Sequence, residues 1–305
     1  MLNLNRRELL AASAASLITQ TLPAFAATPF AFKHGAFEVS VVSDGHLVLP
    51  TRFLAPEAPP AEREALLKAA GQPGEQYNSP TNVTLIRTDR DLILVDMGSG
   101  DRFMPTAGKL WDNLKTAGID KAKINKVIFT HGHPDHLWGT VDELDDLMMP
   151  EAMFFVAGAE WDFWHGDNAA RGLPPERAGF VTGARRNYAA IKDKVKMVKA
   201  GDEIVAGLHI VDTRGHTQGH VSLQLAGGDG LIVGGDVLYH PLISFQHPEW
   251  KPAADHVPDQ AAATRRKLLD RLAADRSKLI GFHLPYPGAG MVERKDSAYR
   301  FVPVA

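Results

Sequence analysis

One stretch of six residues constrains this chain more than any other part of its sequence. Residues 131–136 read His-Gly-His-Pro-Asp-His and directly follow an apolar run, 126–129, that is typical of a buried strand. Three imidazoles and a carboxylate this close together are costly unless a metal ion offsets their mutual repulsion. Side chains at i and i+2 of an extended turn point the same way, so His131 and His133 can bind one ion. Asp135 and His136 begin the next turn and can face a second ion.

Three more candidate ligands stand at the ends of later strand-like runs: His216, Asp236 and His283. Polar residues at strand ends are where α/β folds build their sites. With the six-residue stretch they make five histidines and two aspartates. Seven ligands are the number that two divalent ions need when one carboxylate and one hydroxide bridge them.

The composition excludes several other kinds of chemistry. The chain of 305 residues has no cysteine, which rules out disulfides, thiolate zinc sites and cysteine nucleophiles. Its 33 Lys+Arg and 36 Asp+Glu give a formal net charge of −3, so it lacks the excess positive charge that nucleic-acid binding requires. No apolar run is long enough to predict a membrane span.

The N-terminus is typical of an export signal. Arg6 and Arg7 precede a mildly apolar run rich in Ala and Ser, and Ala24-Phe25-Ala26 offers a small-x-small cleavage pattern. The paired arginines favour the twin-arginine type, and the alternative is an amphipathic first helix of the fold. We therefore expect residues 1–26 to be a signal peptide and the mature protein to be periplasmic or secreted.

Strand-like runs alternate with helical patterns through the rest of the chain. The strands are predicted at 39–42, 82–86, 91–95, 126–129, 208–211, 221–225, 231–233 and 278–282, and the helices at 107–117 and 259–274, the second capped by Asp259. Two segments, 50–80 and 157–187, look irregular because they carry many prolines, glycines and aromatic residues, and they favour functional loops. No repeat or linker divides 27–305, so a single α/β domain is predicted.

With these motifs in this order, the sequence resembles the metallo-β-lactamase superfamily of hydrolases over essentially all of 36–300. The resemblance implies an α/β fold, an αββα sandwich of two sheets flanked by helices. The ligands it implies are His131, His133 and His216 for one ion, Asp135, His136 and His283 for the other, and Asp236 as the bridge. Asp96, in Leu-Val-Asp-Met-Gly, matches the structural aspartate that the family keeps beneath the motif loop.

Further details resemble particular branches of the superfamily. An aspartate at 236 is similar to lactonases, phosphotriesterase-like hydrolases, glyoxalase II and phosphodiesterases, and unlike β-lactamases. Asp236-Val237-Leu238-Tyr239 repeats the D-x-x-Y of N-acyl-homoserine lactonases, in which the tyrosine polarises the scissile carbonyl. The C-terminal run Phe-His-Leu-Pro-Tyr-Pro-Gly-Ala-Gly resembles the methyl parathion hydrolase branch. That resemblance implies that Phe103 and Trp164 line the leaving-group pocket.

The resemblance implies an exported dinuclear hydrolase that opens lactones or cleaves aryl esters by attack of a metal-bridging hydroxide, with phosphotriester cleavage as a side activity. Tyr239 would donate to the developing oxyanion, and Asp135 or Asp236 would pass a proton to the leaving alkoxide. Zinc is the default ion, and Mn, Fe or Co can occupy the same ligands. The aromatic loops favour a small apolar ester or lactone as substrate. The segment 50–80 is a candidate contact for a homodimer.

Two kinds of alternative stay open. One is a different substrate on the same fold: an organophosphate of the methyl parathion type as the main activity, a β-lactam or a thioester. The other is a non-catalytic relic, which would have no reason to keep seven ligands. Among the other histidines, His220 is expected to bond with Ser222. Surface or local hydrogen-bonding roles are expected for His34, His46, His165, His209, His240, His247 and His256.

Overall fold

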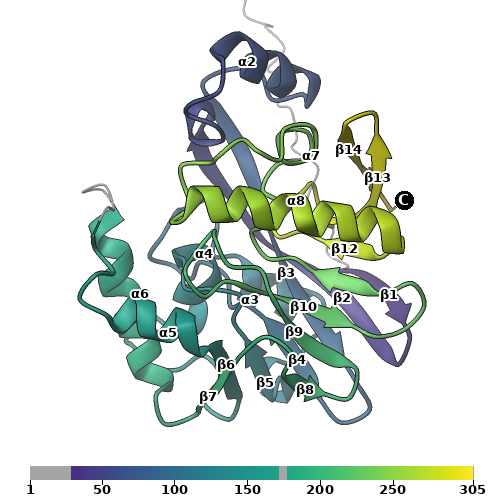
Figure 1. Cartoon of the computed structure of the whole chain (residues 1–305). Helices are drawn as coiled ribbons and strands as arrows, with labels where there is room; N and C mark the ends of the chain where they lie inside the picture. Colours follow the sequence, from purple (N-terminus) through teal and green to yellow (C-terminus); the bar gives the residue numbers. More distant parts are fainter. Residues whose placement is uncertain (1–28, 172–176, 305) are drawn as a thin grey trace, which may run out of the picture.

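The computed structural model describes residues 29–171 and 177–304, so the predicted signal peptide at 1–26 lies outside the described residues. Two sheets of seven strands face each other, and helices cover their outer faces (Figure 1). This is the αββα sandwich expected from the sequence. Within the described ranges, no helix combines the length and the apolar character that a membrane crossing needs.

The first sheet runs in chain order from β1 to β7. Its strands are β1 (Phe30–His34), β2 (Phe37–Pro50), β3 (Gln76–Arg87), β4 (Leu92–Val95), β5 (Lys126–Ile128), β6 (Met153–Ala157) and β7 (Val195–Val198). β1 to β4 pair antiparallel, and β4 to β7 pair parallel. The carboxyl ends of the parallel strands therefore meet at one edge of this sheet.

The second sheet has the order β14-β13-β12-β11-β10-β9-β8. Its strands are β8 (Glu203–Val205), β9 (Leu208–Asp212), β10 (Val221–Leu225), β11 (Leu231–Val233), β12 (Lys278–Ile280), β13 (Ala289–Lys295) and β14 (Ala298–Pro303). All neighbours pair antiparallel except β11 and β12, which pair parallel. The parallel pair brings the ends of β11 and β12 to the same edge.

The main core lies between the two sheets. β4 is apolar at every position because both of its faces are buried: Ile93 and Val95 face the second sheet, and Leu92 and Leu94 face the helices. From the second sheet, residues such as Leu223 complete the inner layer. Such continuous apolar runs identify central strands, which is why the sequence predicted them well.

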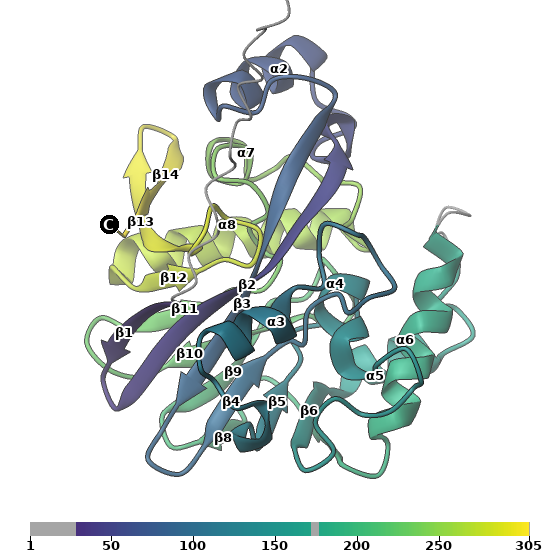
Figure 2. The same ribbon diagram turned by 180° about the vertical axis from the view of Figure 1, so that it is seen from behind.

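The helices cover both outer faces of the sandwich (Figure 2). They are α2 (Pro60–Ala69), α3 (Leu110–Thr116), α4 (Pro134–Leu137), α5 (Gly158–His165), α6 (Ala178–Ile191), α7 (Ile243–Gln246) and α8 (Pro258–Asp275), with 3₁₀ turns η1 (Thr51–Phe53), η2 (Lys121–Lys123) and η3 (Trp138–Thr140). α3, α5 and α6 pack on the first sheet, and α8 packs on the second.

Several sequence predictions of local structure were wrong. The segment 50–80 contains α2 and the start of β3, and the segment 157–187 contains α5 and much of α6. α6 buries Val181, Ala184, Tyr188 and Ile191 at helical spacing, but neighbouring glycines and prolines concealed this pattern. Asp259 does not cap α8, because the helix already begins at the preceding proline.

Candidate metal centre

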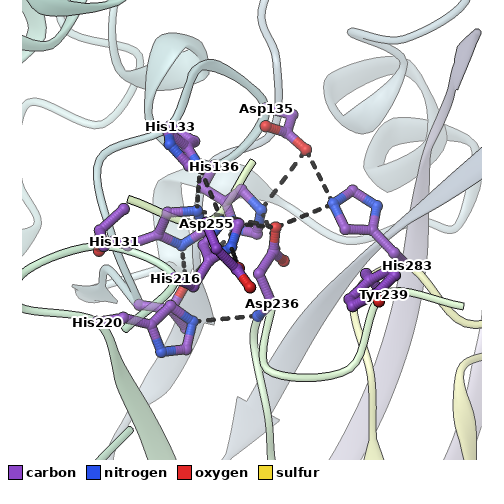
Figure 3. Close-up of polar contacts among 12 residues, drawn as sticks. His131, His133, Asp135, His136, His216, His220, Asp236, Tyr239, Asp255 and His283 are labelled. Atoms are coloured by element: carbon purple, nitrogen blue, oxygen red, sulfur yellow. Dashed lines mark hydrogen bonds and ion pairs between the residues drawn. The ribbon is translucent and has the colours of Figure 1, made fainter. Parts of the chain in front are cut away.

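The seven candidate ligands converge at one edge of the sandwich (Figure 3). Four of them follow β5: His131 and His133 in the loop that leads into α4, and Asp135 and His136 in α4 itself. Three come from the second sheet: His216 before β10, Asp236 after β11 and His283 after β12. Strands of both sheets therefore contribute to the same site, and all seven side chains are buried.

A first group of potential ligands comprises His131, His133, His216 and Asp236, whose ligand atoms lie within 4.8 Å of one another. His133 Nδ1 is 3.0 Å from His131 Nε2 and 2.9 Å from His216 Nε2. Asp236 Oδ2 is 3.3 Å from His216 Nε2. Three imidazole nitrogens and one carboxylate oxygen therefore point at a common centre.

A second group comprises Asp135, His136, Asp236 and His283, again within 4.8 Å. His283 Nε2 is 3.1 Å from Asp236 Oδ2 and 3.3 Å from Asp135 Oδ2. His136 Nε2 is 3.1 Å from Asp236 Oδ1. Asp236 belongs to both groups, so its carboxylate lies between two adjacent His/Asp sites.

The chemistry of these donors fits two divalent metal ions. Among the described residues, the buried atoms Asp135 Oδ2, His136 Nε2 and Asp236 Oδ1 have no hydrogen bond of good geometry. Buried polar atoms are normally paired, so three such atoms facing one centre need another partner. Imidazole nitrogens and carboxylate oxygens are ligands for zinc and for related divalent ions.

The two groups differ in their electrostatics. Burial lowers the pKa of His131 and of His133 well below the usual value, and neighbouring histidines lower it further. In the second group burial acts in the same direction, but the Asp236 and Asp135 carboxylates outweigh it and raise the pKa of His283 to about 10. The same carboxylates and Asp96 hold the pKa of His136 well above its usual value. The second group therefore attracts positive charge.

Surrounding residues orient the candidate ligands. Asp96 Oδ2 lies 2.8 Å from His136 Nδ1, and the Asp96 carboxylate also accepts hydrogen bonds from the amide and hydroxyl of Thr130. Asp96 thus lies beneath the motif loop, where the sequence suggested. His220 Nε2 accepts a hydrogen bond from the backbone amide of Asp236 at 3.1 Å. His220 reaches Ser222 only through Thr213, so the predicted direct bond between them was wrong.

Two adjacent residues that sequence reasoning missed also contact the ligands. Asp255 Oδ1 is 2.9 Å from His216 Nδ1, and Asp255 Oδ2 accepts a hydrogen bond from the buried guanidinium of Arg265 at 3.0 Å. His256 Nε2 is 3.0 Å from His133 Nε2, so the purely local role expected for His256 was wrong. These contacts join residues 39 and 123 positions apart in the chain, and no sequence spacing signals them.

A cavity of about 300 Å³ opens onto both groups, with His133 and His216 of the first and Asp135, Asp236 and His283 in its wall. Phe103 lies in the wall of this cavity. Trp164 does not, and its predicted place in the pocket was wrong. Its ring is completely buried in the core beside α6, where Nε1 donates a hydrogen bond to Glu160 Oε1 at 2.6 Å.

Tyr239 also lines the cavity. Its hydroxyl donates a long hydrogen bond, 3.3 Å, to the carbonyl of Trp250, and the guanidinium of Arg265 stacks 4.9 Å from its ring. Burial raises the pKa of Tyr239, so the phenol keeps its proton at neutral pH. It is therefore a hydrogen-bond donor at the cavity wall.

Comparisons with known proteins agree with this geometry. The sequence profile of the metallo-beta-lactamase superfamily matches residues 77–283 of this chain. AidC, a dizinc quorum-quenching lactonase in complex with the product N-hexanoyl-L-homoserine, is similar at a TM-score of 0.85 and 27% identity, over 91% of this chain and 98% of that chain. The hydrolase AbOPH of the beta lactamase superfamily is similar at a TM-score of 0.85 and 27% identity, over 92% and 98%.

Similarity to curated sequences is more limited. An uncharacterised protein of Mycobacterium leprae (strain TN) is 26% identical over 165 residues, which are 52% of this chain and 66% of that protein. The match thus spans slightly less than two thirds of the relative's length.

Proposed function

Because the chain belongs to the metallo-beta-lactamase superfamily, we propose that it is a dinuclear metal-dependent hydrolase of the lactonase type that opens lactones or cleaves aryl esters. The observation that carries this proposal is the position of two adjacent His/Asp groups in the wall of an apolar cavity. The similarity to AidC, a lactonase with its product bound, supports the same reaction class.

In this proposal each His/Asp group holds one divalent ion, with Asp236 shared between the two. Zinc is the proposed ion, and Mn, Fe or Co can use the same nitrogen and oxygen ligands. Bound divalent ions supply Lewis acidity, which polarises a carbonyl oxygen and brings the pKa of bound water close to neutrality.

The protein's own groups then orient the substrate and handle protons. Tyr239 keeps its phenol proton and can donate it as a hydrogen bond to the developing oxyanion. To do so, the hydroxyl exchanges its long bond to the Trp250 carbonyl for one to the substrate. Asp135 and Asp236 lie in the cavity wall, so either carboxylate can take a proton from the attacking water and pass it to the leaving alkoxide.

The cavity favours a neutral and largely apolar substrate. Its walls include Leu47, Leu49, Phe103 and Phe180, which suit an acyl chain or an aromatic ring. Arg177 is the one Arg or Lys among the described residues of the wall, and its Nη1 donates to the Ala253 carbonyl at 2.7 Å. A phosphate monoester would need a cluster of cations, so a lactone or aryl ester is the better substrate class.

The test is metal content and hydrolysis by the purified protein. We expect about two divalent ions per chain and turnover of dihydrocoumarin, N-hexanoyl-homoserine lactone or phenyl acetate. Asp236→Ala should abolish that turnover because it removes the shared ligand. Faster turnover of methyl parathion than of all three would favour an organophosphate hydrolase instead. Two bound ions without turnover of any substrate would contradict the proposal.

A further inference from the structure

A buried carboxylate that the proposed reaction does not use lies behind the metal centre. Glu160, in α5, is almost completely buried, and its two oxygens accept four hydrogen bonds. Oε1 accepts from the Gly132 amide at 2.8 Å and from Trp164 Nε1 at 2.6 Å. Oε2 accepts from Thr217 Oγ1 at 2.6 Å and from the Gly219 amide at 2.8 Å.

Three of these four partners belong to the two loops that carry the three histidines of the first group, and the fourth, Trp164, lies in α5 with Glu160. Gly132 lies between His131 and His133, and Thr217 directly follows His216. One carboxylate therefore joins two loops that are about 85 residues apart in the chain. Since one bond to each loop runs to a backbone amide, of Gly132 and of Gly219, these bonds fix the path of each loop rather than one side chain.

Both loops also pack against α5 so closely that neither contact leaves space for a side chain. A Cβ atom on Gly219 would lie 2.0 Å from the backbone nitrogen of Glu160, and one on Gly132 would lie 2.3 Å from Trp164 Nε1. Both positions therefore require glycine. This close packing keeps the carboxylate within bonding distance of both loops.

The charge of Glu160 makes it hard to replace. Within residues 29–171 and 177–304, no ion pair involves Glu160, so four N–H and O–H dipoles alone stabilise its carboxylate. A carboxylate offers acceptor sites on both oxygens, whereas an amide presents donors at one end. A glutamine would therefore direct its NH₂ group at hydrogen-bond donors of one loop.

We propose that Glu160 is a positioning residue of the metal centre, which preforms the first group by holding the His131–His133 loop and the His216 loop at fixed separation. This inference rests on the proposed dinuclear function. The second group has supports of its own, because Asp96 holds His136 and the Pro80 carbonyl accepts from His283 Nδ1 at 2.8 Å. Loss of Glu160 should therefore weaken the binding of the metal equivalent in the first group and leave the equivalent in the second group unchanged.

Titration of the metal-free protein with Co²⁺, followed by its visible absorption bands, tests the inference. We expect the wild type to bind two equivalents tightly. Glu160→Gln should bind one equivalent with unchanged affinity and the other about 10- to 100-fold more weakly, as is typical when a group supporting a metal ligand is lost. Thr217→Val removes one of the four bonds and should weaken the same equivalent by a smaller factor. It keeps the test valid if Glu160→Gln does not fold.

Asp44→Asn is the matched control. Asp44 is also a fully buried carboxylate that accepts backbone amides, from Ser99, Gly108 and Leu110, but it touches neither histidine loop. We expect it to lower the free energy of unfolding while both Co²⁺ equivalents stay tight.

The outcomes separate the two proposals. Wild-type affinity for both equivalents in Glu160→Gln, or equal weakening of both, would overturn the positioning role. A wild-type protein that binds fewer than two equivalents would instead overturn the proposed dinuclear function, and the positioning role with it.

Discussion

Each candidate histidine ligand presents one ring nitrogen to the centre because a neighbour engages the other. Asp96 engages His136 Nδ1, Asp255 engages His216 Nδ1, and the Pro80 carbonyl engages His283 Nδ1. These contacts select the tautomer that leaves the metal-facing nitrogen free to coordinate. His133 presents the opposite ring nitrogen: its Nδ1 faces the centre, and its Nε2 faces His256.

That arrangement makes His256→Ala a specific test. When His133 Nδ1 binds a metal ion, the ring proton lies on Nε2, and the variant removes His256 Nε2, the atom 3.0 Å away that would accept it. The ring can then rotate away from the centre. We expect metal affinity, measured by competition with a chelator, to fall about 10-fold or more. His209→Ala, at a partly exposed position of β9 beside Glu203, should leave the metal affinity unchanged. Equal affinity in both variants would show that His256 does not orient His133.

The role of Tyr239 can be separated from general packing at the cavity wall. Tyr239→Phe removes the proposed donor to the oxyanion, and we expect kcat to fall about 100-fold while metal content stays unchanged. Tyr77→Phe is a matched control, because Tyr77 is a second buried phenol in the same wall. If the two variants lose similar activity, or if Tyr77→Phe loses more, the assignment of Tyr239 is wrong.

Residues that act through local sequence were predictable, and residues that act through long-range contacts were not. Four candidate ligands fall within six positions, so a single sequence carries the signal. Asp255 and His256 reach the ligands, and Glu160 reaches the loops that carry them, only because the segment before α8 and α5 fold against these loops. Trp164 was misplaced for a related reason. An aromatic residue near a site has the same composition signal in the core as in a pocket wall.

At the scale of elements, the long β2–β3 hairpin explains the cavity. Beyond a bulge between Ser43 and His46, both strands continue past the sheet and supply residues such as Leu47 and Tyr77 to the wall. The connection between the two strands and the start of β3, with Tyr77, fall in the segment 50–80, which was predicted to be irregular. Its prolines end β2 and begin α2 rather than breaking the structure, and proline alone does not distinguish these cases.

Asp44, in β2, holds the loop between β4 and α3 to the first sheet. Its carboxylate accepts from the amides of Ser99, Gly108 and Leu110 at 2.8, 3.2 and 2.8 Å, which anchors the loop between β4 and α3. Asp44→Ala would leave buried amides without acceptors, each at a cost of about 1–3 kcal/mol. We expect urea denaturation to give a loss of about 3 kcal/mol or more in the free energy of unfolding.

Asp112→Ala is the control for this variant, because Asp112 is an exposed carboxylate in the first turn of α3. Its loss should cost about 0.5 kcal/mol, the size expected for a surface charge near a helix end. Comparable losses in the two variants would contradict an anchoring role for Asp44.

At the scale of the whole molecule, the metal centre connects the two sheets. The loop after β5 supplies ligands from the first sheet, and the segments around β10, β11 and β12 supply them from the second. Ions bound there join the two layers at one edge and favour the folded state by mass action. We therefore expect chelation to lower the melting temperature of the protein.

The electrostatics of the site determine how this stabilisation changes with pH. In the metal-free protein the pKa of His283 is raised to about 10, so protonated His283 stabilises the fold below about pH 6.5, and this contribution is lost as pH rises towards 10. Metal binding displaces that proton, so affinity in the second group increases with pH. The difference in melting temperature between metal-loaded and metal-free protein should therefore widen from pH 6 to pH 9.

The first group should respond differently to acid. The pKa values of His131 and His133 lie well below the usual value, so these rings stay neutral and protons compete with metal there only under more acidic conditions. Lowering the pH from 8 should thus release one metal equivalent per chain before the other, which dialysis and elemental analysis at each pH can measure. In Glu160→Gln the first group binds metal more weakly, so its equivalent should be released at the same pH as the other equivalent or at a higher pH. Simultaneous loss of both equivalents from the wild-type protein would contradict the electrostatic difference between the two groups.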